Sequence, residues 1–174
     1  MPLKHLISWI GRQDIEGTQR QPPSGPIVDF LRVHSSVTVT LLSDWPRDAE
    51  AEYLTALQRA VSAVVRVQHV RLKDPTDYLG IFRAADQILA DVIRDTPVKE
   101  VGIHTSPGTS AMAAVWILLA KTKYAGATLF ERSAADPRCV DVRNPRWCRP
   151  GRTRAGVHGE SAGHCARYNG SARS

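Results

Sequence analysis

Residues 106–110, with the sequence SPGTS, carry residue types that suit the binding of an anion. Ser106 and Thr109 supply hydroxyl groups, and Gly108 allows a tight turn in which the backbone approaches a ligand closely. A very apolar stretch that predicts a helix follows directly, and a helix N-terminus offers unpaired N–H groups and the positive end of a dipole. A phosphate would suit this loop. The alternative is that Thr109 or Ser110 only caps the helix.

Other side chains could contribute to such a site, and each also has a simpler interpretation. The forked guanidinium of Arg12 could hold a phosphate, or it could be a solvated loop arginine. Asp14, Asp44 and Asp74 stand where turn or cap residues are common. Trp45 could stack on a base, although a hydrophobic cover is the more common role.

Local motifs favour ligand binding over catalysis. The sequence contains neither a Walker A loop nor a G-x-G-x-x-G dinucleotide fingerprint. It also lacks G-x-S-x-G and H-E-x-x-H, so no nucleophile and base can be paired from local motifs. His104 and Trp116 stand in apolar segments and are expected to belong to the core. We therefore predict no catalytic residue, no cofactor and no metal ligand.

Apolar periodicity predicts strands and helices in alternation. The predicted strands span residues 3–10, 37–42, 64–72, 100–105 and 125–131. The predicted helices span residues 26–31, 48–61, 78–94 and 111–123. Residues 11–25 are polar and rich in Gly and Pro, and this predicts a loop.

This alternation predicts an α/β fold, a Rossmann-like and mostly parallel sheet of five to six strands with helices on both faces. Ligands of such sheets bind beyond the carboxyl ends of the strands. That rule selects four loops, which carry Gly11 and Arg12, Ser43 and Asp44, residues 73–76, and residues 106–110.

Charge divides the chain into two parts. Residues 1–131 hold 14 Lys+Arg and 14 Asp+Glu, whereas residues 132–174 hold nine Arg and three acidic residues, so the whole net charge of +6 lies there. We predict a domain over 1–131 and a basic Arg/Cys-rich tail over 132–174, which has too few apolar side chains to order itself beyond a short strand at its start.

Three interpretations of the tail compete. It could be a basic arm that contacts RNA or DNA through phosphates. It could hold a metal, although the spacing of its cysteines and histidines fits no common zinc module. We favour a frame-shifted end, because Arg, Gly, Ala, Ser, Pro, Cys and Trp without Lys, Ile, Leu or Phe are typical of a GC-rich gene read out of frame. With no signal peptide and no membrane-length apolar run, the expected location is the cytoplasm.

Four stretches together resemble a known family. They are LISWIGRQD, LLSDWP, DPTDYLGIF and HTSPGTSAMAAVWILLAKTKY, at residues 6–14, 41–46, 74–82 and 104–124. Over about residues 3–131 the chain resembles the CARF domain, the CRISPR-associated Rossmann-fold sensor. It is most similar to the N-terminal sensor domains of RtcR-like activators that work with sigma-N.

The resemblance implies a homodimer that binds an RNA-derived nucleotide, either a cyclic oligoadenylate or an RNA end with a cyclic phosphate. Binding would regulate transcription or a CRISPR-linked antiviral response. The ligand-binding residues that it implies are Gly11, Arg12, Ser43, Asp44, Ser106, Pro107, Gly108, Thr109 and Met112.

Two other functions stay open. A metal-independent ring nuclease would cleave cyclic oligoadenylate, with Ser106 or Thr109 orienting a hydroxyl and Arg12 or backbone N–H groups stabilising charge. A nucleic-acid-binding module would act through the basic tail. The chain departs from the family in having no ATPase motif and no DNA-reading helix, so it would be a sensor without its effector.

Overall fold

The computed structural model describes residues 3–34, 37–132 and 139–141. Its strands are β1 His5–Trp9, β2 Thr38–Ser43, β3 Val64–His69, β4 Val101–His104, β5 Thr128–Arg132 and β6 Cys139–Asp141. Its α-helices are α1 Arg12–Gly17, α2 Pro26–Val33, α3 Arg47–Ala60, α4 Tyr78–Asp95 and α5 Ser110–Lys121. A single 3-10 turn, Val98–Glu100, precedes β4. Within the described residues no helix is both long and apolar enough to span a membrane.

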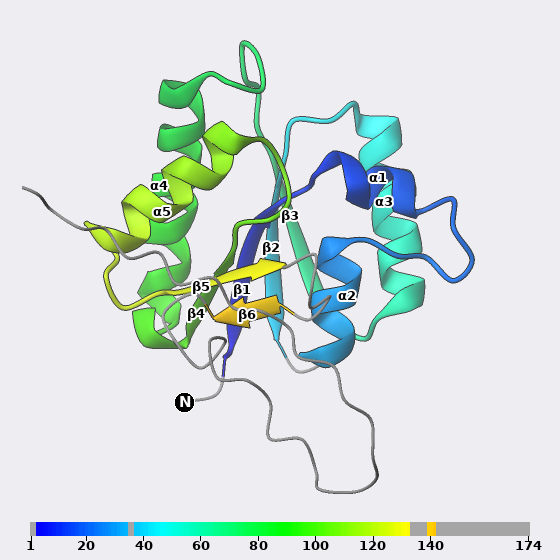
Figure 1. The fold of residues 1–174 in the computed structure, drawn as a ribbon, viewed down its shortest axis with the longest axis horizontal. Helices are drawn as coiled ribbons and strands as arrows, with labels where there is room; N and C mark the ends of the chain where they lie inside the picture. Colours follow the sequence, from blue (N-terminus) through cyan, green and yellow to red (C-terminus); the bar gives the residue numbers. More distant parts are fainter. Residues whose placement is uncertain (1–2, 35–36, 133–138, 142–174) are drawn as a thin grey trace, which may run out of the picture.

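The strands form one sheet in the order β3-β2-β1-β4-β5-β6. The first five strands are parallel, and β6 runs antiparallel to β5. This confirms the predicted Rossmann-like, mostly parallel α/β fold. Figure 1 shows α4 and α5 on one side of the sheet and α1, α2 and α3 on the other.

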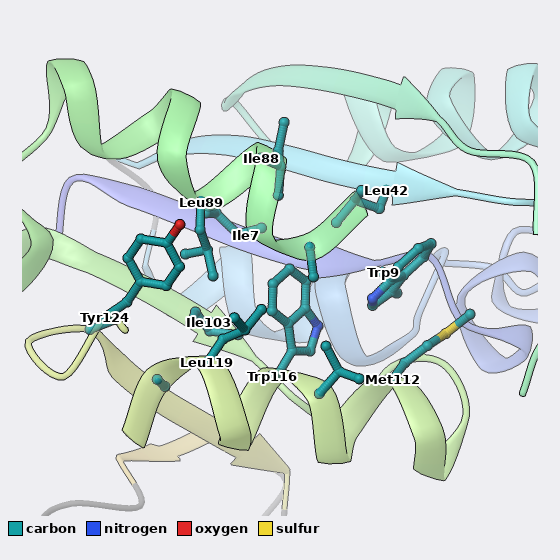
Figure 2. Close-up of a cluster of buried hydrophobic side chains, with 14 of the residues drawn as sticks. Ile7, Trp9, Leu42, Ile88, Leu89, Ile103, Met112, Trp116, Leu119 and Tyr124 are labelled. Carbon is teal, nitrogen blue, oxygen red and sulfur yellow. The ribbon is translucent and has the colours of Figure 1, made fainter. Parts of the chain in front are cut away.

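Two apolar clusters hold the layers together. One lies between the sheet and the α4–α5 layer and includes Trp9 and Trp116 (Figure 2). The other lies between the sheet and the remaining helices and includes Phe30 and Tyr53. The apolar stripe of α4 is buried from Ile81 to Val92, as its periodicity predicts. The apolar α5 is buried on one face only, because Ile117 and Leu118 are about half exposed, whereas burial on most of its surface was expected. The predicted core positions of Trp116 and His104 are confirmed.

Residues 11–25 differ from the prediction, because they contain a helix where a loop was expected. The helix α1 covers residues 12–17, and its first turn is held by Asp14, whose Oδ2 accepts a hydrogen bond from the Gly11 N–H at 3.0 Å. The Oδ1 of the same carboxyl accepts from the Ile27 N–H at 3.0 Å, at the start of α2. A contact to a residue 13 positions away thus stabilises a short helix that local composition does not indicate.

The first residue assigned to the tail belongs to the sheet. Arg132 is the last residue of β5, and a second strand of the tail segment, Cys139–Asp141, is β6. The short strand predicted at the start of the tail is therefore present. The other two cysteines and both histidines of the tail lie outside the described residues, as do the alternatives that depend on them.

Candidate functional site

The order of the strands creates a crevice between β1 and β4. After β1 the chain passes to the α1–α3 layer, and after β4 it passes to α5 on the opposite face. Such a switch point is where open α/β sheets bind ligands. A cavity of about 340 Å³ lies here, lined by the beginnings of α1 and α2, the loop between β4 and α5, and the end of β5.

A second cavity, of about 540 Å³, lies at the opposite rim, between the first residues of β1 and β2 and the end of α4. Its lining carries charges of both signs, since it includes Arg66 and Arg94 as well as Asp91 and Asp95. Because these charges balance and the cavity lies away from the carboxyl ends of the strands, we assign the candidate site to the smaller cavity.

Three of the predicted site residues, Gly11, Pro107 and Gly108, lie close together beside this crevice, and of these Gly108 lines the cavity. A Cβ added to Gly11 would lie 2.6 Å from the Gly108 backbone nitrogen and 3.1 Å from the Pro107 Cα. Gly108 itself has a φ of 94°, a left-handed conformation that favours glycine. The loops that follow β1 and β4 therefore touch backbone to backbone, as the sequence-based grouping of Gly11 with residues 106–110 requires.

Ser106 lines the cavity with a hydroxyl that can donate. Its Oγ accepts a hydrogen bond from the Arg132 backbone N–H at 2.6 Å. In the described part of the chain the hydroxyl makes no other hydrogen bond, so its O–H is available to an acceptor in the cavity. A phosphate oxygen is such an acceptor.

Thr109 also lines the cavity, whereas Met112 does not, and both support the loop. The Thr109 hydroxyl donates to the Pro75 carbonyl at 2.8 Å and accepts from the Met112 N–H at 3.3 Å, so it caps α5, which is the simpler of its two interpretations. Met112 is only 2% exposed, and its Sδ accepts from the Thr109 N–H at 3.4 Å. Figure 2 shows Met112 on α5 near Trp9.

Three further predicted residues, Arg12, Ser43 and Asp44, also do not line the cavity. Arg12 is 82% exposed and pairs with Glu16, with 2.6 Å between its Nε and Oε1. Ser43 is fully buried, and its hydroxyl is engaged by the Glu50 carboxylate and the Trp45 N–H. Asp44 is half-buried, and burial raises the pKa of its carboxyl.

Trp45 and Asp74 have the simpler of their possible roles. The indole N–H of Trp45 donates to the Ile10 carbonyl at 2.9 Å, and its ring packs against the core. The Asp74 carboxylate accepts from the Thr76 N–H at 2.7 Å, in a turn. Neither is placed to stack on or coordinate a ligand in the cavity.

The cation that does line the cavity is Arg132, which the sequence analysis assigned to the tail. Its side chain is 33% exposed, and its Nη2 lies 3.3 Å from the Asp29 Oδ2 on α2. One signal could have found it. The strand predicted over 125–131 ends directly before this residue, and the rule that ligands bind beyond the carboxyl ends of strands applies to that strand as well.

Two titratable groups beneath the site are affected by burial. Desolvation raises the pKa of Asp14 to about 7, against the opposing effect of its two backbone hydrogen bonds and the charge of Arg132. Desolvation also lowers the pKa of His104 to about 3, with Arg132 contributing further. His104 is therefore neutral near pH 7 and unsuited to act as a general acid.

The raised pKa of Asp14 predicts a pH-dependent stability. The folded-state pKa of about 7 exceeds the ordinary value of 3.8, so the folded chain binds the extra proton between about pH 4 and pH 7. The free energy of unfolding should fall as the pH rises through this window, by at most about 1.4 kcal/mol per pH unit. Urea denaturation of the wild type and Asp14→Asn across the window measures this. The two slopes should differ, and identical slopes would contradict the assignment.

Neither a protein-family model nor a curated protein sequence matches this chain. Solved structures do. One is Csm6 of Enterococcus italicus bound to cyclic hexa-2'-fluoro-hexa-dAMP, with a TM-score of 0.64 and 19% identity over 76% of this chain and 34% of that chain. Another is Can2 of Sulfobacillus thermosulfidooxidans in complex with cyclic tetra-adenylate, with a TM-score of 0.56 and 14% identity over 81% and 35%.

The chain shares its fold with these two proteins. It spans about a third of the length of each. At these identities the likeness to Csm6 and Can2 concerns the arrangement of strands and helices.

Proposed function

We propose that this chain is a CARF domain that senses an RNA-derived nucleotide, either a cyclic oligoadenylate or an RNA end with a cyclic phosphate. The observation that carries the proposal is the cavity at the switch point, which is lined by both Ser106, with its hydroxyl, and Arg132, with its guanidinium. The CARF-like stretches of the sequence support it. So do the cyclic oligonucleotides bound to the two proteins of the same fold.

The size of the cavity bears on the form of the complex. About 340 Å³ is near the lower end of the range for small-molecule sites, roughly 300–1,000 Å³. One nucleotide unit of a ring would fill it, and the remaining units would need further surface. A two-fold dimer that brings two such cavities together would supply it, and we include the homodimer in the proposal.

A thermal-shift panel tests the sensor. The full chain is heated with cyclic tri-, tetra- and hexa-adenylate and with a short RNA that ends in a cyclic phosphate. A ligand that binds only the folded state stabilises it by about 2.7 kcal/mol at 100 times its Kd, which corresponds to a rise in Tm of about 5–10 °C for a chain of this size. AMP at the same concentration serves as the control. No rise with any of the four probes would contradict the proposal.

Cleavage of the ligand is a second candidate, favoured by the Glu131 carboxylate that lines the same cavity as the Ser106 hydroxyl. A metal-independent ring nuclease needs a ribose hydroxyl held in line with the phosphate, and a carboxylate could accept its proton. Long incubation of cyclic tetra-adenylate with the full chain decides between sensor and nuclease. Intact ligand would exclude cleavage, and a linear product would establish it.

The biological output is part of the same proposal. A sensor of this kind would act in the cytoplasm and regulate transcription, as in the RtcR-like activators, or a CRISPR-linked response. Binding of nucleic acid through the basic tail is the remaining alternative, and its affinity should fall steeply with salt.

A further inference from the structure

A backbone hydrogen bond and an ion pair hold Arg132 at the cavity. Its backbone N–H donates to the Ser106 Oγ at 2.6 Å, which ties the end of β5 to the loop between β4 and α5. Its guanidinium meets the Asp29 carboxylate on α2 at 3.3 Å. The side chain is thus directed from one wall of the crevice toward another, and two-thirds of it is withdrawn from solvent.

The Arg132 guanidinium has N–H donors that the ion pair with Asp29 does not use. An arginine has five N–H donors in a planar fork, and the ion pair with Asp29 is made through Nη2. The other oxygen of the Asp29 carboxylate faces the Arg32 Nη1 at 3.4 Å, so Asp29 has a second cation of its own. Arg132 can therefore bind an anion in the cavity while it stays in contact with Asp29.

The position of this charge differs from that of Arg12. Arg12 is 82% exposed and paired with Glu16, and it does not line the cavity. The charge of Arg132 reaches the interior, where it contributes to the lowered pKa of His104. A charge in this partly desolvated position acts more strongly on an anion than one surrounded by water.

We propose that Arg132 is the phosphate-binding side chain of this cavity and that the Ser106 hydroxyl donates to the same phosphate. The inference deepens the proposed function and rests on it. It also assigns to the site a residue of the 132–174 segment, which the resemblance to the CARF family does not cover.

The experiment compares Arg132→Gln, Arg132→Lys and the control Arg59→Gln in the full chain. Arg59 lies in the last turn of α3, at the opposite rim, so its loss changes the net charge equally without touching the cavity. The probe is cyclic tetra-adenylate, and its Kd is measured by calorimetry at several salt concentrations. Thermal unfolding of each variant verifies that it is folded.

Arg132→Gln should weaken binding about 10- to 100-fold, the range for hydrogen bonds to a charged group. It should also reduce the salt slope by about 0.7, the value for one phosphate contact to a single strand. Arg132→Lys should recover only part of the affinity, because an ammonium lacks the fork. Arg59→Gln should stay within about twofold of the wild type. Equal affinities of Arg132→Gln and Arg59→Gln would overturn the inference and leave the proposed function standing.

A second titration separates the phosphate-binding role of Arg132 from the proposed function as a nucleotide sensor. Inorganic pyrophosphate replaces cyclic tetra-adenylate as the probe of the anion site. Pyrophosphate bound by the wild type and lost in Arg132→Gln, with none of the four probes of the thermal-shift panel bound, would support the inference and remove the proposed function. No binding of pyrophosphate or of any of the four probes to the wild type would overturn both.

Discussion

Replacement of Trp116 by alanine is expected to lower the free energy of unfolding by about 3–5 kcal/mol, the range for removal of a large buried aromatic side chain. Trp116 is 0% exposed and reaches from α5 into the cluster between that helix and the sheet (Figure 2). The cavity left behind would be walled by rigid elements, so it would not close. Urea denaturation followed by circular dichroism measures the loss.

Two further variants give this prediction its controls. Leu118→Ala changes the same helix at a side chain that is 50% exposed, and it should cost less than about 1 kcal/mol. The buried Trp116 Nε1 has no hydrogen-bond partner among the described residues, so Trp116→Phe removes no hydrogen bond and should cost less than alanine. A loss in Leu118→Ala equal to that in Trp116→Ala would contradict the packing argument.

Gly11→Ala is expected to impair both stability and ligand binding. The new Cβ would lie 2.6 Å from the Gly108 nitrogen, and backbone atoms cannot move aside as the end of a side chain does. Overpacking of this kind costs about 1–3 kcal/mol. Because the displaced loop carries Ser106, the affinity for a ligand of the cavity should fall as well, and calorimetry with cyclic tetra-adenylate measures it.

Gly126→Ala separates a loss of stability from a loss of ligand binding. Its Cβ would meet the Val98 side chain, 2.6 Å from Cγ1, at the other end of the sheet. This variant should lose stability and keep the affinity of the wild type. If both glycine variants weaken binding equally, the effect of Gly11→Ala comes from general destabilisation and the assignment of the crevice loses its support.

The sequence predicted the architecture because most elements carry their own periodicity. The apolar stripe of α4 and the β-branched residues of β2 indicate helix and strand without knowledge of the rest of the chain. The helix α1 lacks such a pattern. Its stability depends on the contact of Asp14 with the Ile27 N–H, which becomes visible only when α1 and α2 are placed together.

The candidate site was predictable in part for a related reason. The loop at residues 106–110 was found from its own composition and the strand before it. Composition does not show that the Thr109 hydroxyl donates its hydrogen bond to the Pro75 carbonyl, or that Ser43 is buried beside Glu50. Arg132 was missed because the change in charge at that point suggested a boundary between domain and tail, whereas Arg132 is the last residue of β5.

The bare backbone contact between Gly11 and residues 107–108 has a mechanical consequence. The atoms nearest to Gly11 are backbone atoms of residues 107 and 108 and the Pro107 Cβ, none of which is the free end of a flexible side chain, so a displacement of one loop would press on the other. One loop leads into α1 and the other into α5, and these helices cover opposite faces of the sheet. A molecule that pushes on either loop therefore transmits its force to both outer layers at once.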